Sequence, residues 1–127
     1  MSVSISLVQV AIGGELGAMA RFGLGVWLLR LWGPGFPVAV LTANVLGSFL
    51  MGLFVVMAAQ RGLMHLQPLV MTGILGGFTT FSAFSLETVT LFERGHIGQA
   101  ALYVGLSVGL SIAALVLGVV VARSFGS

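Results

Sequence analysis

Long apolar segments alternate with short polar ones along the whole chain. Apolar side chains dominate residues 5–31, 37–59, 68–92 and 97–122. In an α-helix, roughly 20 apolar residues cross a bilayer core about 30 Å thick, and each of these segments reaches that length. The pattern therefore predicts an all-α membrane protein with four transmembrane helices.

The segments between these helices are short and rich in turn-forming residues. They lie at residues 32–35, 60–62 and 93–96. Connections of this length join neighbouring antiparallel helices, so we expect residues 1–127 to form a single four-helix transmembrane domain. Trp27 and Trp32 mark the interfacial end of the first helix, because indole rings favour the level of the lipid headgroups.

Composition narrows the class of protein. Of the 127 residues, 58% are hydrophobic and 6% are charged, and the mean hydropathy is +1.17. Soluble domains carry about 25% charged residues, so these values argue against a soluble enzyme, a disordered chain and a nucleic-acid-binding module. Cysteine is absent, which excludes disulfides and thiolate metal sites.

The sequence shows no catalytic constellation. His65 and His96 fall in loops, without carboxylate or cysteine companions at metal-ligand spacing. The glycines at 73–77 are followed by no lysine, so they do not form a nucleotide-binding loop. We therefore expect neither an enzyme nor an ATP-driven pump. Residues 1–5 lack a basic region, so we expect the first apolar segment to be a retained helix.

Arginine residues, which orient membrane helices, are evenly divided between the two sides. With four spans, Arg61 and Arg123 fall on one side of the membrane, and Arg30 and Arg94 fall on the other. Both insertion directions are then open to the chain, which makes antiparallel dimers available. Four helices leave little room for an aqueous pore, which favours a pathway between subunits. We predict a dual-topology homodimer.

The third segment carries the most unusual local sequence. Its run from Gly73 to Ser85 places paired glycines and a cluster of hydroxyl groups at mid-membrane depth. Paired glycines destabilise a helix, and hydroxyl side chains can bond the backbone groups that a break releases. We predict a helix broken around Gly76–Thr80, which would expose carbonyl and N–H groups as in many ion transporters. The alternative is a flexible but continuous helix.

Other small residues are spaced for close helix packing. Small residues four positions apart let helix backbones approach where lipid supplies no hydrophobic drive for association. Pairs with this spacing include Gly13 and Gly17, Ser48 and Gly52, and Gly105 and Gly109. We expect these positions to lie at helix–helix contacts.

Several polar side chains fall inside the predicted helices, where ionisable groups are costly. Glu15 and Arg21 are six residues apart on the first helix, so they are no i,i+4 ion pair. Arg21 would either attract anions or tie down the end of another helix. Asn44 in the second helix would either bond a neighbouring helix or donate its amide N–H groups to an anion.

Two further patterns fit the lining of an ion pathway. Tyr103, Ser107 and Ser111 recur every four residues and form one polar stripe, suited either to packing or to lining a path. Phe81 and Phe84 are three apart and share a helical face just after the predicted break. The edge of a phenyl ring carries the positive part of its quadrupole, so the pair would serve either core packing or a small anion.

Three motifs resemble those of the Fluc (CrcB) fluoride channels. The run Gly-Gly-Phe-Thr-Thr-Phe-Ser-Ala-Phe-Ser at 76–85 resembles the third-helix signature of that family. Residues 13–18 followed by Arg21-Phe22 resemble its first-helix motif, and residues 44–49 resemble its second-helix motif. The resemblance covers essentially the whole chain, with the motifs in the expected order.

The resemblance implies an antiparallel homodimer with two fluoride pathways at the dimer interface and a central structural sodium ion. Carried over by motif, the backbone carbonyl groups of Gly76 and Thr79 would bind the sodium ion, because a hard cation favours oxygen ligands. The residues implied in or near the fluoride pathway are Asn44, Thr80, Phe81, Phe84, Glu87, Tyr103, Ser107 and Ser111. We add Arg21 to the predicted pathway because its charge would attract anions.

We therefore predict a passive, fluoride-selective channel that lets fluoride leave a microbial cytoplasm through the inner membrane. An alternative from another class is a proton-coupled small multidrug exporter, which needs an acidic residue in the first span, such as Glu15. Glu15 stands where the Fluc family usually has a small or apolar residue. Phe22 replaces a common Tyr, and Val40 replaces the Thr of some members. A third alternative is a membrane assembly factor that transports no ion.

Overall fold

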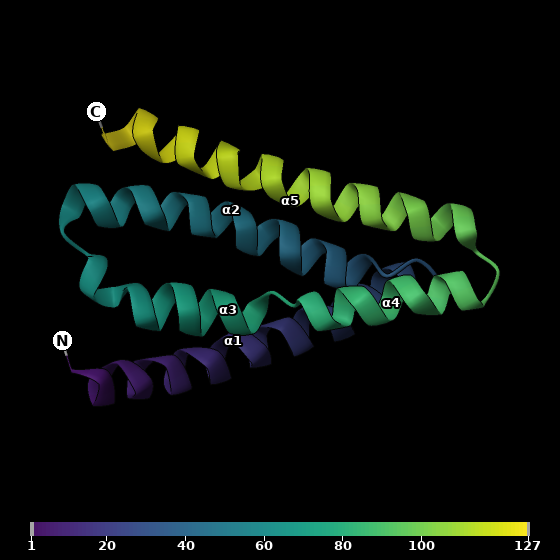
Figure 1. The fold of residues 1–127 in the computed structure, drawn as a ribbon, viewed down its shortest axis with the longest axis horizontal. Helices are drawn as coiled ribbons and strands as arrows, with labels where there is room; N and C mark the ends of the chain where they lie inside the picture. The colour runs from purple at the N-terminus through teal and green to yellow at the C-terminus, as the bar shows by residue number, and fades with distance from the viewer. Residues whose placement is uncertain (1, 127) are drawn as a thin grey trace.

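The computed structural model describes residues 2–126, which form helices joined by short loops (Figure 1). Four helical spans are long and apolar enough to cross a membrane, which confirms the predicted all-α architecture. In chain order the elements are α1 (Val3–Trp32), α2 (Val38–Arg61), the 3-10 helix η1 (Met64–Leu66), the π-helix η2 (Pro68–Leu75), α3 (Gly76–Phe78), α4 (Phe81–Glu93) and α5 (Ile97–Gly126). The third span is composite, running from η1 to α4.

Most helix ends lie slightly beyond the predicted ones because capping, not the last apolar residue, sets them. Ser2 precedes α1, and its side chain accepts a hydrogen bond from the N–H of Ile5 at 3.2 Å. Gly62 follows α2 with a φ of +68°, and its N–H donates to the carbonyl of Ala58. This left-handed conformation suits glycine and ends many helices.

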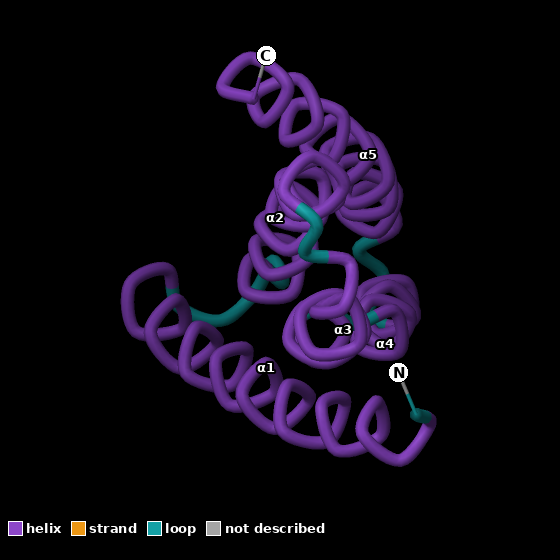
Figure 2. The backbone as a smooth tube through the Cα atoms, turned by 90° about the vertical axis from the view of Figure 1, so that its left-hand side faces the viewer, coloured by secondary structure: helices purple, strands orange, loops and turns teal. Residues whose placement is uncertain are grey.

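The spans run up and down in turn, so both termini lie at the same end of the molecule (Figure 1). α5 packs along α2, and η2 together with α3 packs along α1. Figure 2 shows α1 crossing one side of the broken span, with α2 and α5 on the other side. The third span therefore lies between α1 and α2.

Glycine residues bring α1 and the third span into backbone contact. A Cβ atom at Gly13 or Gly17 would collide with backbone atoms of η2. A Cβ atom at Gly77 would lie 2.6 Å from the carbonyl oxygen of Gly14. Only hydrogen fits at these positions, which confirms the predicted close packing at Gly13 and Gly17.

A second glycine contact joins α2 to α5. Gly52 meets the backbone of α5, and Gly118 meets the backbone of α2. The prediction of close packing is therefore confirmed at Gly52. It is wrong within this chain at Gly105 and Gly109, where an added Cβ would meet nothing within 4 Å. These two glycines lie on exposed parts of α5, because the side of α5 that contacts α2 carries Gly118 instead.

The third span is broken within the predicted range, but the residues that leave the helix are threonines. Gly76 is helical, with φ −64° and ψ −37°, and Gly77 continues α3. Thr79 (φ −89°, ψ 158°) and Thr80 (φ −155°, ψ 120°) are extended, and the helix then resumes as α4. β-Branched residues accept extended backbone readily, whereas Gly77 serves the contact with α1. A continuous third helix is thereby excluded.

Few large side chains are buried within the chain. Its core combines buried side chains of α4 and α5 with half-buried ones from α2, α4 and the preceding loop: Leu91, Ala100, Tyr103, Phe36, Val40, Leu41 and Phe84. Many large apolar side chains of α1, α4 and α5 are exposed. In water such surfaces would drive aggregation, whereas lipid chains cover them favourably. The chain is a multi-pass membrane protein.

Candidate functional site

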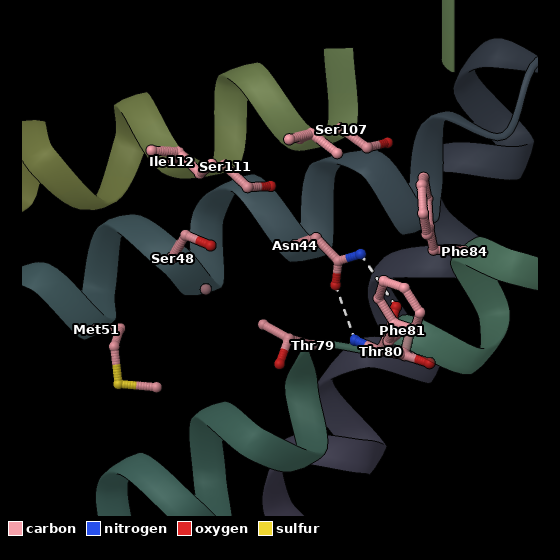
Figure 3. Close-up of a pocket in the computed structure, with 12 residues that line it drawn as sticks. Asn44, Ser48, Met51, Thr79, Thr80, Phe81, Phe84, Ser107, Ser111 and Ile112 are labelled. Atoms are coloured by element: carbon pink, nitrogen blue, oxygen red, sulfur yellow. Dashed lines mark hydrogen bonds between the residues drawn. The ribbon is translucent and has the colours of Figure 1, made fainter. Parts of the chain in front are cut away.

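The side chain of Asn44 in α2 bonds the backbone at the break in the third span. Its Nδ2 donates to the carbonyl of Thr80 at 3.1 Å, and its Oδ1 accepts from the N–H of Thr80 at 2.8 Å (Figure 3). In a continuous helix that N–H would donate to the carbonyl of Gly76, four residues earlier. Asn44 thus replaces one helix hydrogen bond and leaves the Gly76 carbonyl without that donor. Of the two roles open to Asn44, the structure shows the bond to a neighbouring helix.

The hydroxyl groups of the two threonines bond other backbone groups at the break. Thr79 Oγ1 donates to the carbonyl of Leu75 at 2.9 Å, the same oxygen that accepts the Thr79 N–H. Thr80 Oγ1 accepts from the N–H of Ala83 at 3.1 Å and caps the start of α4. Side chains of the span itself therefore stabilise the interruption, as the hydroxyl cluster predicts.

Arg21 reaches the same break from α1. Its Nε donates to the carbonyl of Gly77 at 3.3 Å. A cation at the carboxyl end of a helical segment also interacts favourably with the helix dipole. Of the two roles open to Arg21, the structure shows the one that ties down a helix end. Attraction of anions by Arg21 stays a prediction.

A cavity of about 320 Å³ lies beside the break. Residues of α2, the break, α4 and α5 converge on it (Figure 3). It brings together, from three separate stretches of sequence, the predicted pathway residues Asn44, Thr80, Phe81, Phe84, Ser107 and Ser111. The geometry combines amide and hydroxyl groups with two aromatic rings in one open, largely apolar pocket, a donor set suited to a small anion.

Sequence reasoning missed several residues of this cavity. Ser48 and Met51 line it on α2, and Val108 and Ile112 line it on α5. Ser48 follows Asn44 by four residues and therefore shares its helical face, so the spacing alone could have identified it. Met51, Val108 and Ile112 are apolar residues in apolar helices, and nothing in the sequence distinguishes them from lipid-facing neighbours.

Phe81 and Phe84 stand at the start of α4 on the wall of the cavity. Their ring centroids are 5.5 Å apart, with an interplanar angle of 49°. Phe84 is half-buried and contacts the Tyr103 ring at 5.3 Å, so it contributes to core packing as well. Phe81 is 78% exposed, so packing within this chain does not account for its position.

The polar stripe of α5 divides between the cavity and the core. Ser107 and Ser111 line the cavity, whereas Tyr103 is fully buried behind Phe84 and is not among the lining residues. Among residues 2–126, the hydroxyl groups of Tyr103 and Ser107 are buried without a hydrogen-bond partner. A buried unpaired hydroxyl costs about 1–3 kcal/mol, so an ion, a water molecule or a second protomer that bonded it would stabilise the site.

The acidic residues singled out in the sequence lie away from this cavity. Glu87 of α4 lines a second cavity, of about 280 Å³, beside Phe36 and the end of α1. Glu15 is exposed on α1 and lines neither of these two cavities. The structure therefore does not bring Glu87 together with Asn44 and Phe81, although the resemblance implies that all three lie near one pathway.

Gly76 and Thr79, the residues predicted to bind sodium, flank the bend of the third span. In the part of the chain that the structure describes, no three His, Cys, Asp or Glu side chains are grouped to hold a metal ion. Backbone carbonyl groups are then the oxygen donors that suit a hard cation here. The Gly76 carbonyl fits this role, because Asn44 has taken the N–H that it would accept in a continuous helix.

Comparison with known proteins gives a family for this architecture. Residues 8–119 match the family model described as CrcB-like protein, Camphor Resistance (CrcB). The chain belongs to the CrcB family. The match spans all four membrane helices, including the break and the cavity beside it.

Relatives within the CrcB family cover nearly the full chain. A protein of Ruegeria sp. (strain TM1040) is 68% identical over 120 residues, covering 94% of this chain and 95% of its own. One of Roseobacter denitrificans is 67% identical over 120 residues, covering 93% and 95%. One of Rhizobium etli (strain CIAT 652) is 49% identical over 122 residues, covering 94% and 98%. All three are named fluoride-specific ion channel FluC.

Proposed function

We propose that this chain forms a passive ion channel selective for fluoride. The observation that carries the proposal is the cavity at the break, where an asparagine amide, serine hydroxyls and two phenylalanine rings meet. Membership of the CrcB family, with relatives named fluoride-specific ion channels, supports it. No energy source is needed, because fluoride moves down its own electrochemical gradient.

Selectivity follows from the balance of donors in the cavity. Asn44 has two N–H groups on Nδ2, and its bond to Thr80 uses one of them, which leaves the second to donate to fluoride. The hydroxyl groups of Ser107 and Ser111 add donors, and the ring edges of Phe81 and Phe84 add weaker positive potential. Fluoride thus exchanges water for donors strong enough to admit it and weak enough to release it.

Further residues on and beyond the cavity wall extend the path. Thr80 adds a hydroxyl group where the break meets α4. The hydroxyl of Tyr103, which has no hydrogen-bond partner among residues 2–126, stands behind Phe84 and adds a further donor beside the path. Arg21 and Glu87 line separate cavities and set the electrostatic potential at the entrances rather than contacting the ion in the narrow part.

The functional unit is an antiparallel homodimer with two pores at its interface. Arg61 and Arg123 balance Arg30 and Arg94, so both orientations of the chain insert. The exposure of Phe81 in the single chain leaves one side of the cavity for a second copy to cover. An isologous contact between two identical copies provides that cover twice, once for each cavity.

Gly76 and Thr79 would hold a structural sodium ion in this dimer. Gly76 and Thr79 from both copies supply backbone carbonyl oxygens, with the Gly76 carbonyl freed by Asn44. When bound, the ion neutralises the partial negative charges of carbonyl groups that meet at the break. The carbonyl groups of the break would thereby keep their arrangement without taking part in the movement of fluoride.

The channel protects a microbial cell from fluoride. Hydrogen fluoride crosses lipid as the neutral acid and ionises in the less acidic cytoplasm, where the anion is trapped. A fluoride-selective pore in the inner membrane lets that anion leave. Selectivity against chloride is essential, because a pore that carried chloride would collapse the membrane potential.

The direct test is efflux from liposomes that contain the purified protein, measured with a fluoride electrode and with a chloride electrode as control. We expect fluoride to leave rapidly while chloride stays. Glu15→Gln tests the multidrug-exporter alternative in the same liposomes, because Glu15 is exposed and away from the cavity. The channel proposal predicts that this variant conducts like wild type, whereas proton-coupled export requires the carboxylate. Absence of any ion flux would favour an assembly factor.

A further inference from the structure

A row of four aromatic rings leads from the cavity into the core of the chain. Successive ring centroids are 5.5 Å apart from Phe81 to Phe84, 5.3 Å from Phe84 to Tyr103 and 5.6 Å from Tyr103 to Phe36. The first two rings line the cavity beside the break. The last belongs to the loop before α2 and lines the separate cavity that contains Glu87. The row therefore joins the two cavities through the core.

Tyr103 is the ring in this row that carries a hydroxyl group, and no hydrogen bond in the described part of the chain fixes it. It is fully buried, and its hydroxyl group has no partner among residues 2–126. Phe36 meets its ring edge-on at 87°, and Phe84 meets it at 39°. Aromatic contacts of this kind have preferred geometries, so the two phenylalanines help to fix the Tyr103 ring, which also packs with Leu91 and Ala100.

Phe36 lies between a glycine with a positive φ and a proline. Gly35 has a φ of +123°, a conformation that a residue with a side chain rarely adopts. Pro37 follows, and a residue before proline is restricted to extended conformations. The carbonyl of Phe36 accepts the N–H of Val38 at 2.8 Å. The loop thus presents the Phe36 ring to Tyr103, with the backbone of Phe36 restricted by Pro37.

We infer that Phe36 is a positioning residue of the ion pathway, which fixes the Tyr103 ring and, through it, the Phe84 ring on the cavity wall. The inference rests on the proposed function, because it assigns Phe36 to the same route for fluoride. Phe36 is not among the residues that line the cavity, and its ring pairs with Tyr103. Phe36 acts through Tyr103, so its replacement should lower fluoride conduction while the protein stays folded.

The test compares Phe36→Leu, which removes the ring, with Phe36→Trp, which keeps an aromatic group. Phe125→Leu is the matched control, because Phe125 is 83% exposed near the end of α5. Fluoride efflux from liposomes measures function. Tyr103 is the single tyrosine of the chain, so labelling with 3-fluorotyrosine gives one ¹⁹F signal that reports the position of its ring.

We expect Phe36→Leu to lower fluoride efflux roughly fivefold, the effect of losing one aromatic contact. Its ¹⁹F signal should shift, while Phe36→Trp and Phe125→Leu keep efflux near that of wild type. All variants should elute as wild type does in size-exclusion chromatography. If Phe36→Leu does not elute as wild type does, Phe36→Met replaces it with the same expectations, because the unbranched methionine side chain adapts to an irregular gap.

Three results would overturn the inference. One is unchanged efflux in Phe36→Leu. Another is a loss of efflux in both Phe36→Leu and Phe36→Trp. The third is a loss of efflux in Phe36→Leu with an unmoved ¹⁹F signal. Either of these last two results would indicate a general packing role for Phe36. Failure of the wild-type protein to carry fluoride is a different result, because it rejects the proposed function itself and the pathway role of Phe36 with it.

Discussion

The two halves of the third span meet at Thr79 and Thr80 but are held in different ways. The first half, η2 with α3, lies against α1 with glycine backbones in contact, and Gly73, Leu75 and Phe78 are buried in it. The second half, α4, buries only Leu91 and begins with the exposed Phe81. The first half is fixed by its backbone contact with α1, and we call it the anchored half. The second half carries side chains that face the cavity, and we call it the presenting half.

This difference explains how a break survives in the middle of a membrane helix. Unpaired backbone groups are costly in lipid, so an interruption persists only where other groups bond them. Arg21 bonds the carboxyl end of the anchored half, and Asn44 and Thr80 bond the start of the other. The anchored half supplies the fixed frame against which the phenylalanines of α4 are placed. Substitutions in the two halves test that division, beginning with those that should perturb the protein most.

The strongest disruption is expected at the anchor. Gly17→Leu forces a side chain into backbone atoms of the third span and should destabilise the protein by about 3 kcal/mol. Gly23→Leu is the matched control, because a Cβ at Gly23 meets nothing within 4 Å. The measurement is the fraction that stays monodisperse in detergent after heating. Equal losses in both variants would show that α1 does not anchor the break.

The second-largest effect is expected from removing the Asn44 amide that bonds the break. Asn44→Ala leaves the N–H of Thr80 unpaired and removes one of the donors to its carbonyl, which should cost about 1–3 kcal/mol locally. Hydrogen exchange at residues 76–85 should therefore become faster. Thr42→Ala, on the same helix but away from the cavity, should leave that exchange unchanged. Unchanged protection from exchange in Asn44→Ala would show that the asparagine does not stabilise the break.

The presenting half should respond in function rather than in stability. Phe81→Ile should lower fluoride efflux about tenfold, the effect of losing roughly 1.4 kcal/mol of interaction with the ion. Thermal stability should barely change, because Phe81 is 78% exposed. Phe92→Ile removes another exposed ring from α4 and should conduct normally. Matching efflux in the two variants would contradict a special role for Phe81.

A smaller effect is expected at the cap of α4. Thr80→Ala removes the hydroxyl that accepts the N–H of Ala83 and should destabilise the helix start by about 1 kcal/mol. Thr80→Ser retains the hydroxyl and should behave like wild type. Denaturant titration in detergent, followed by circular dichroism, measures the difference. Loss of stability in Thr80→Ser as well would point to the β-branch instead of the cap.

The smallest effect is expected at Arg21. Its bond to the carbonyl of Gly77 is long, at 3.3 Å, and a charge at a helix end contributes about 0.3–1 kcal/mol. Arg21→Gln should lower stability within that range, and Arg21→Lys should recover part of it. The same titration measures both variants. A loss several times larger would mean that Arg21 holds the break more than the glycine contacts do.

Much of the fold could be predicted from the sequence because hydrophobic length and turn residues act locally. The four spans and the location of the break follow from apolar runs and from the Gly-Thr signature. The conformations at the break could not be predicted residue by residue. Thr79 and Thr80, not Gly76 and Gly77, leave the helix, because which residue gives way depends on contacts with α1 and α2. No signal in residues 68–75 indicates the π-helix.

The candidate site shows the same limit. Asn44, Phe81 and the serines of α5 could be nominated because polar groups and signature motifs are conspicuous in an apolar chain. Their meeting at one cavity depends on how each helix is rotated, which hydropathy does not record. For the same reason the spacing of Tyr103 with Ser107 does not show that Tyr103 lies behind the cavity.

The central claim is that the chain conducts fluoride passively and in preference to chloride. Current recordings from planar bilayers, with unequal fluoride and chloride concentrations on the two sides, test it most directly. We predict that the current reverses at the equilibrium potential of fluoride and does not respond to an imposed pH gradient. Reversal at the chloride potential, or a shift that follows the pH gradient, would contradict the account.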